Sequence, residues 1–546
     1  MQTTQNPTGE IRGQFGRSLG TGSFTAPTAP PAWTDDHSDA NAASRFLIQT
    51  TFGPTTALIS QVQSSGYSDF LNQQFAIQPT LHTPLTDVAV AALASGTSPS
   101  SYQSWEAWWK NSLTAPDQLR QRVAFALSEI MVTSDAPNAL TQVPVAMSSY
   151  TDMLLNDAFG NVRQLIEDVT LHPTMGQFLN MAHNDKADPV KGTHPNENYA
   201  REVMQLFTIG LNRLNPDGSL ALNTSGNPVP TYGQTEITGI ARVFTGWNWA
   251  QSGAASWSNY TANYRAPMVP VPSHHDGAAK PILGGIVLPS GQSQAQDLKD
   301  TLDVIFYHPN FGPFLARELI QRLVTSNPSP GYIYRVASAF NDNGSGVRGD
   351  MKAILKAILL DYEARSPAVV TGVGYGHERE PVLRLSALYR AFNASSTGGT
   401  YPLHNLDGSL GQTPMHSASV FNFFSPNYSQ PGPIAQASLF SPEFQITTDS
   451  TVISSANTMR SATFQAASTT SSTVIACDFT PQIALASNPT TLVDSLNTLL
   501  MGGQMSSAMR SQVISTVTSI SASSTLERAQ TAVHLIVTSP QFVIQK

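Results

Sequence analysis

The sequence of 546 residues has one cysteine, Cys477, and charged residues make up only 12% of it. A single thiol excludes an intramolecular disulfide and a zinc site built from several thiolates. The charged fraction is about half of the roughly 25% that is usual in soluble proteins. Uncharged polar side chains supply the rest of the polar surface, a composition that favours an exported protein.

The sequence also lacks long apolar runs and long basic runs. No segment reaches 18 uninterrupted apolar residues, so no transmembrane helix is expected. The formal net charge of −8 and the lack of a long basic run argue against nucleic acid and anionic lipid as partners. The N-terminus lacks the basic start and apolar run of a signal peptide, so the chain is either cytosolic or a mature or truncated form.

Sequence fingerprints of the common enzyme classes are also lacking. The chain contains no HExxH, GxSxG, P-loop or GxGxxG motif. Zincins, serine hydrolases, nucleotide phosphotransferases and dinucleotide oxidoreductases therefore have no positive support.

Helical periodicity dominates what is present, and we predict a mainly α fold. After a flexible arm at 1–35, a main helical domain at 36–460 carries a small β-hairpin insertion near 211–232. A linker and a C-terminal helical extension occupy 461–546. The length itself predicts two or three hydrophobic cores. The predicted helices are 117–133, 162–171, 196–210, 235–247, 297–306, 314–325, 349–360, 379–392 and 526–537, with a short strand expected at 282–288.

A faint internal repeat indicates a duplicated helix pair. The segment that begins at Arg120 is echoed from Ile320, and the segment that begins at Asn161 is echoed from Gly346. Chance similarity between amphipathic helices is the alternative. If the repeat is real, two helical units surround a site contributed by the segments between them.

The strongest candidate site is the start of the predicted helix 196–210. Glu197 and Arg201 are four residues apart and share a helix face, with Glu202 beside them. Asn196 and Asn198 add polar groups at the helix start, where they can bind substrate.

A second candidate is the loop PSHHDGAAK. His274, His275 and Asp276 have the side chains that a divalent metal prefers, provided that another ligand comes from elsewhere. We expect this loop to fold over the start of helix 196–210, with Lys280 contacting substrate. A solvated turn or a hydrogen-bonded structural histidine is the alternative.

The same residues can act without a metal. Glu197 or Glu202 can serve as a general base, Arg201 can bind an anionic group, and His275 can relay a proton. Together with Asp276, these residues form the predicted catalytic set. Arg379 and Glu380, at the start of another helix, add substrate contacts. The alternative is that the charged residues form a buried ion network that holds helices in register.

Aromatic side chains favour a carbohydrate or peptide ligand. Trp247 and Trp249 offer flat faces beside amide donors and are predicted to contact substrate.

Several motifs together resemble one bacterial family, DUF1800. They are NENYARE with FTIGL, TEITGIARVFTGW, HHDGAAK, HPNFGPFLARELIQRLVTSNPSP, REPVLRL and SASVFNFFSPNYSQPG. The resemblance implies an exported, helical, periplasmic or secreted protein, and a DUF1501-family protein as a partner. It implies no established activity. Gln205 and Glu236 depart from the family pattern, which often has Glu and Asp there.

Two functions remain open from the sequence. The first is an extracytoplasmic hydrolase or related enzyme that acts on a polysaccharide or peptide polymer through the Glu/Arg/His/Asp residues, with or without one divalent metal ion. The second is a non-catalytic surface or periplasmic scaffold that works with a DUF1501 protein.

Overall fold

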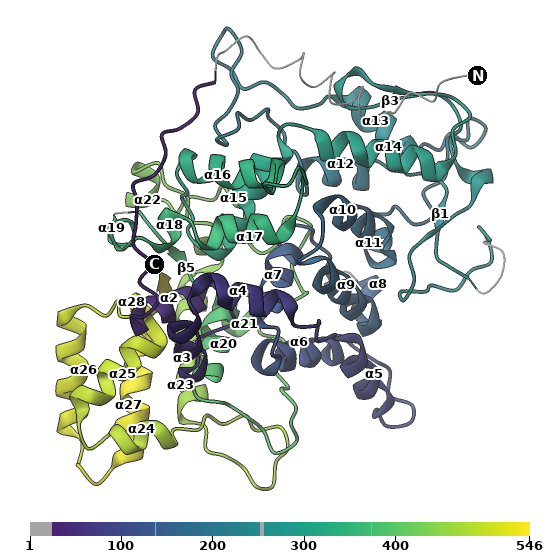
Figure 1. Cartoon of the computed structure of the whole chain (residues 1–546). Coiled ribbons are helices and arrows are strands. Elements are labelled where there is room, and N and C mark those ends of the chain that lie inside the picture. The colour runs from purple at the N-terminus through teal and green to yellow at the C-terminus, as the bar shows by residue number, and fades with distance from the viewer. Residues whose placement is uncertain (1–23, 137, 252–255, 373) are drawn as a thin grey trace.

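Helices form most of the molecule, as the sequence predicts. The computed structural model describes residues 24–136, 138–251, 256–372 and 374–546 (Figure 1). About 52% of the chain is helical, and the described residues contain only two-stranded antiparallel sheets. The mainly α prediction is therefore confirmed.

The elements follow one another in short segments. The α-helices are α2 (Ala40–Thr50), α3 (Thr56–Ser65), α4 (Tyr67–Ala76), α5 (Thr83–Ala91), α6 (Tyr102–Thr114), α7 (Gln118–Ser128), α8 (Asn138–Thr141), α9 (Pro144–Asp157), α10 (Val162–Leu171), α11 (Pro173–Phe178), α12 (Asn198–Gln205), α13 (Gln234–Val243), α14 (Gln294–Tyr307), α15 (Phe311–Leu323), α16 (Pro330–Asn341), α17 (Met351–Leu359), α18 (Tyr362–Arg365), α19 (Pro367–Val370), α20 (Pro381–Ala391), α21 (Asp407–Leu410), α22 (Pro433–Gln436), α23 (Asp449–Phe464), α24 (Thr480–Leu485), α25 (Pro489–Met501), α26 (Ser507–Ser519), α27 (Thr525–Val537) and α28 (Pro540–Val543). The 3-10 helices are η1 (Pro272–His274), η2 (Leu283–Gly285) and η3 (Pro442–Ile446). The strands are β1 (Trp247–Asn248), β2 (Val269–Pro270), β3 (Lys280–Pro281), β4 (Val287–Leu288), β5 (His377–Glu378) and β6 (Ile544–Gln545).

All nine predicted helical segments contain helices, and α10 matches its predicted bounds at both ends. Helix α12 is shorter than predicted for a local reason. The side chain of Asn196 accepts the N–H of Asn198, which delays the helix start. At the other end the N–H of Gly210, which has a positive φ of 70°, bonds to the carbonyl of Met204 and closes the helix.

The predicted hairpin insertion is present as a ladder of isolated antiparallel bridges. They join Asn212 to Pro230, Leu214 to Leu220 and Leu222 to Pro228. The strand expected at 282–288 is found as β4, which pairs with β3. The predicted arm at 1–35 lies partly outside the described residues, and its part from 24 to 35 forms neither helix nor strand.

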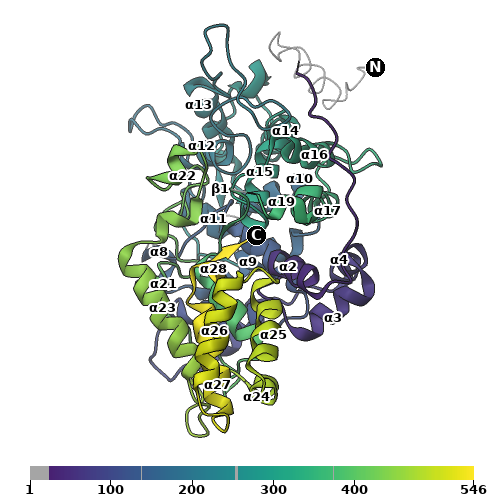
Figure 2. The same cartoon turned by 90° about the vertical axis from the view of Figure 1, so that its left-hand side faces the viewer.

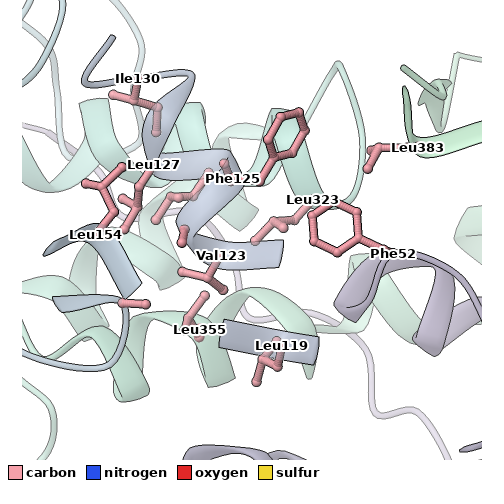
Figure 3. Close-up of a cluster of buried hydrophobic side chains, with 14 of the residues drawn as sticks. Phe52, Leu119, Val123, Phe125, Leu127, Ile130, Leu154, Leu323, Leu355 and Leu383 are labelled. Carbon is pink, nitrogen blue, oxygen red and sulfur yellow. The ribbon is translucent and has the colours of Figure 1, made fainter. Parts of the chain in front are cut away.

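One main hydrophobic cluster runs from Ala43 to Phe542, and a much smaller one surrounds Leu140. The described residues thus form two hydrophobic clusters of very unequal size, and the larger takes in most of the fold. Helix α7 lies in the middle of the main cluster, where Leu119, Val123 and Phe125 are buried against side chains of several other helices (Figure 3). No helix of the described residues is long and apolar enough to cross a membrane.

The two copies of the predicted repeat meet each other. The N–H of Val162, at the start of α10, donates to the carbonyl of Gly349, and the N–H of Met351, at the start of α17, donates to the carbonyl of Gly160. The distances are 2.8 and 3.0 Å. These two bonds are the pair that a single antiparallel bridge forms, here between Asn161 and Asp350, so the two segments are adjacent and the duplication stays a prediction.

The same reciprocity holds for a pair of buried arginines. Arg122 of α7 donates to the carbonyl of Arg322, next to the end of α15, at 2.6 Å. Arg322 donates to the carbonyl of Glu129, at the end of α7, at 3.0 Å. Each helix therefore supplies a guanidinium to the C-terminal carbonyls of the other, where helices carry unsatisfied acceptors and partial negative charge.

Buried arginines satisfy helix ends throughout the fold. Their acceptors lie in the last turn or at the C-cap of another helix. The pairs are Arg45 with Arg365 of α18, Arg120 with Leu155 of α9 and Ile77 after α4, Arg122 with Arg322 of α15, Arg322 with Glu129 after α7, Arg379 with Leu500 of α25, Arg390 with Leu113 of α6, and Arg528 with Ala486 after α24 and Ile520 after α26.

The C-terminal helices pack onto the rest of the molecule. Helix α25 contacts α2, and β6 pairs with β5, so the last strand lies against residues 377–378 (Figure 2). Residues of α25 and α27 belong to the main cluster. The segment after 461 thus shares the core of the preceding part.

The fold makes stability depend on pH through His172. Burial lowers the pKa of this side chain from 6.5 to about 4, although its hydrogen bond to the backbone of Ser149 opposes the shift. Its Nδ1 accepts the N–H of Thr174 at the start of α11, a role that protonation ends. We expect the free energy of unfolding to fall as pH drops from 6.5 towards 4, because the unfolded chain then binds the extra proton.

This loss reaches about 3 kcal/mol below pH 4 for His172 alone. Urea titrations of wild type and His172→Asn between pH 7 and 4 check it, because asparagine can cap the helix but does not titrate. An equal pH slope in both proteins would contradict the role of His172.

Candidate functional site

The predicted catalytic residues of α12 form an ion pair at the surface. Arg201 donates to Oε2 of Glu197 at 2.7 Å, and Oε1 of Glu197 accepts from Gln234 at 2.8 Å and from Thr238 at 3.0 Å. Burial alone would raise the pKa of the Glu197 carboxyl, but the hydrogen bonds from Gln234, Thr238 and Arg201 hold it below its usual value. Both carboxylate oxygens are therefore already engaged.

Glu202 does not join this pair. Its Oε2 is buried without a hydrogen-bond partner among the described residues, and burial raises its pKa despite the nearby charge of Arg201. The side chain of Arg201 is 41% exposed. The alternative of a closed, buried network of Glu197, Arg201 and Glu202 is thus not what the structure shows.

The asparagines at the start of α12 also have partners. The N–H of Asn196 donates to the side chain of Asn184, and the amide of Asn198 donates to that of Asn180. Both are exposed overall, so they remain available to a ligand at the surface.

The side chains of His274, His275 and Asp276 each bond to a different partner. Nδ1 of His274 lies 2.9 Å from Asp185, and its ring stacks on Trp257. Asp276 makes a two-pronged ion pair with Arg242, at 2.7 and 3.0 Å, in the last turn of α13. No group of three or more His, Cys, Asp or Glu among the described residues could hold a metal ion, so the predicted ligands do not converge.

His275 belongs to a buried charged cluster. Its Nε2 lies 2.9 Å from Oδ2 of Asp297 in α14, and Nζ of Lys280 lies 2.6 Å from the same oxygen. Its Nδ1 faces the backbone carbonyl of Thr245 at 3.1 Å. Lys280, predicted to contact substrate, is fully buried instead, because its ammonium is the partner of Asp297.

The loop lies beside the start of α12 without touching its charged residues. The segment 184–186 stands between them: Lys186 donates its N–H to His274, and Asn184 bonds to both Asn196 and Gly246. Within the described part of the chain, no hydrogen bond or ion pair joins residues 274–276 to Glu197, Arg201 or Glu202. The composite site predicted from the sequence is therefore not assembled here.

The predicted aromatic contacts lie inside the protein. Trp247 is buried in β1, and Trp249 is buried with its ring stacked on Tyr260. Their faces are not open to a ligand. The exposed member of this aromatic group is Tyr260.

Arg379 and Glu380 are buried elsewhere, around the start of α20. Arg379 donates to the carbonyl of Leu500 and lies over the ring of Phe542, and burial followed by the charge of Arg384 lowers its pKa to about 9. Glu380 accepts from Gln412. Arg379 thus joins the C-terminal helices to the start of α20. Both side chains lie apart from α12 and do not extend that site, although the sequence predicts that they contact substrate there.

Sequence reasoning did not find a cavity of about 410 Å³ between α20, α21, α23, η3 and α27–α28. Its lining comes from three segments that are far apart in the chain, near 378–384, 410–459 and 537–544. No local motif marks such a surface.

The fold and these contacts define a mainly α-helical protein whose conspicuous polar residues are mostly engaged with one another. Residues 45–544 match a family model described as "Protein of unknown function (DUF1800)". The chain therefore belongs to the DUF1800 family, as its motifs predict. No curated protein and no solved structure matches the chain.

The two clusters make different stability predictions. Arg201→Ala should lower the free energy of unfolding by less than about 1 kcal/mol, because solvent screens a half-exposed pair. Lys280→Met should lower it by about 3–5 kcal/mol, because a fully buried Asp297 loses its strongest partner. Urea denaturation of both variants measures the difference. A larger loss in Arg201→Ala than in Lys280→Met would contradict this assignment.

Proposed function

We propose that this protein is a non-catalytic scaffold or partner protein that works outside the bacterial cytoplasm, in the periplasm or after secretion. One observation supports this proposal: the polar side-chain atoms of His275 and Asp276 are bonded within the protein. His275 bonds to Asp297 and Thr245, and Asp276 bonds to Arg242. These bonds join the loop to the end of α13 and to α14. A side chain that exchanges protons or binds substrate needs donor or acceptor atoms that are not already engaged. A side chain that joins two helices needs those atoms to be bonded within the protein.

The extracytoplasmic location follows from the low charged fraction and from the DUF1800 resemblance. The same resemblance implies the partner, a protein of the DUF1501 family. Co-expression of the two proteins followed by size-exclusion chromatography with light scattering should give one complex. Separate elution of the two folded proteins would count against this partner.

The competing function is a hydrolase or related enzyme on a polysaccharide or peptide polymer. One observation favours it: Glu202 keeps a carboxylate oxygen without a partner, and burial raises its pKa. Burial, followed by the charge of Glu202, also raises the pKa of the Tyr232 hydroxyl to about 12, and this hydroxyl has no hydrogen-bond partner within the described part of the chain. A carboxyl whose pKa is raised, beside a phenol, has the residue types of a general acid.

Paired substitutions discriminate between the two functions. Under the scaffold proposal His275→Ala/Asp276→Asn should lower the free energy of unfolding by about 3–5 kcal/mol, because Asp297 and Arg242 lose buried partners. Lys191→Ala/His194→Ala, in an exposed segment, is the matched control and should change it by less than about 0.5 kcal/mol.

The hydrolase function predicts the opposite pattern. The double variant at 275–276 would keep its stability, and the wild type would release reducing ends from soluble polysaccharide or free amines from casein. Loss of that release in Glu202→Gln, with unchanged thermal unfolding, would overturn the scaffold proposal.

A further inference from the structure

The cavity beside α20 is lined mostly by apolar side chains. Leu410, Phe444, Val452, Met459, Val537 and Val543 form much of its wall. Its volume of about 410 Å³ is within the range of pockets that hold small organic ligands. The elements around it contact one another, since α23 packs against α20, α21 and α27 (Figure 1).

One charged side chain of this wall, that of Arg384, lacks the partners that the other buried arginines have. Arg384 is 8% exposed, and none of its guanidinium nitrogens donates a hydrogen bond to a described residue. Its nearest carboxylate oxygen, Oε1 of Glu378, is 3.8 Å from Nη2, beyond hydrogen-bond reach. Its Nε is buried without a hydrogen-bond partner among the described residues, which is costly, whereas Nη1 and Nη2 are not fully buried.

Arg365 is the instructive comparison. It too is buried without a hydrogen bond among the described residues, but its guanidinium lies 5.1 Å from the ring centre of Phe46 and 5.5 Å from that of Tyr67. Aromatic faces stabilise a cation there. Arg384 has no such ring in the described structure and borders the cavity instead.

Glu378 and Arg384 both line the cavity, and the guanidinium is the more exposed of the two charges. The side chain of Glu378 is 1% exposed and that of Arg384 is 10% exposed. Oε2 of Glu378 is buried, and its Oε1 accepts the hydroxyl of Thr447 at 2.7 Å. Arg384 also lies in the first turns of α20, an 11-residue helix whose N-terminus adds positive potential.

We propose that this cavity binds a small amphipathic molecule with an apolar body and a carboxylate head, and that Arg384 receives the carboxylate. The planar fork of a guanidinium matches a carboxylate with two parallel hydrogen bonds. The apolar body then replaces water against the walls formed by α21, α23 and α27–α28. This site is separate from the α12 and α13 residues and goes beyond the scaffold function.

Isothermal titration calorimetry with dodecanoate, below its micelle concentration, tests the proposal. Dodecanol supplies the same body without the charge, and dodecyltrimethylammonium supplies the opposite charge. We expect dodecanoate to bind one to one and more tightly than either analogue. Ala456→Trp, which fills the cavity, should abolish binding of both dodecanoate and dodecanol.

The role of Arg384 is tested separately. Arg384→Met should weaken dodecanoate at least tenfold and leave dodecanol unchanged, whereas Arg384→Lys should keep part of the preference for the acid. Because Glu378 loses its counter-charge in Arg384→Met, Glu378→Gln/Arg384→Met is the variant to use if circular dichroism shows unfolding.

Three outcomes would overturn the proposal. The first is that folded wild type does not bind dodecanoate, which means that water alone fills the cavity. The second is equal affinity for dodecanoate and dodecanol. The third is full dodecanoate affinity in folded variants that lack Arg384.

Discussion

The bond between a buried arginine and the C-terminal carbonyls of another helix is the interaction on which this structure most depends. A fold made of short helices creates many helix ends inside the protein, each with unsatisfied carbonyl groups. Water cannot reach those that face the core, so a side-chain donor must satisfy them. Arginine suits this task because one guanidinium can serve two carbonyls, as Arg528 does for α24 and α26.

This constraint explains how a chain with so few charges places so many of them inside. The guanidinium groups are neutralised in part by helix dipoles, so a carboxylate is not needed for each. Arg122 and Arg322 each serve the helix of the other, and Arg322 also pairs with the carboxylate of Glu318 at 2.7 Å. The bonds at Val162 and Met351 join the segments near 161 and 350 through one antiparallel bridge, so these segments of the predicted repeat are adjacent in the fold.

The sequence predicts the helices far better than the site. Periodicity located α10 and α20 because their apolar residues recur with a helical period, but the polar helix α23 was not predicted. The residue types around His275 were correctly singled out as unusual. The partner of His275 is Asp297, 22 residues away, and the partner of Asp276 is Arg242, 34 residues away. Only the tertiary packing decides whether such side chains bind a metal, bind a substrate or form a salt bridge. The cavity at Arg384 is harder still, because nothing local distinguishes this arginine from those that cap helices.

The central claim, that buried arginines stabilise the fold through helix ends, is tested most directly by the unfolding free energies of Arg122→Met, Arg322→Met and the double variant in urea. Arg510→Met, which removes a partly exposed pair with Asp494, is the control. We predict a loss of about 1.5–3 kcal/mol for each buried arginine, with non-additive losses in the double variant, and a smaller loss for the control. Losses at Arg122 and Arg322 no larger than that of the control would contradict the account.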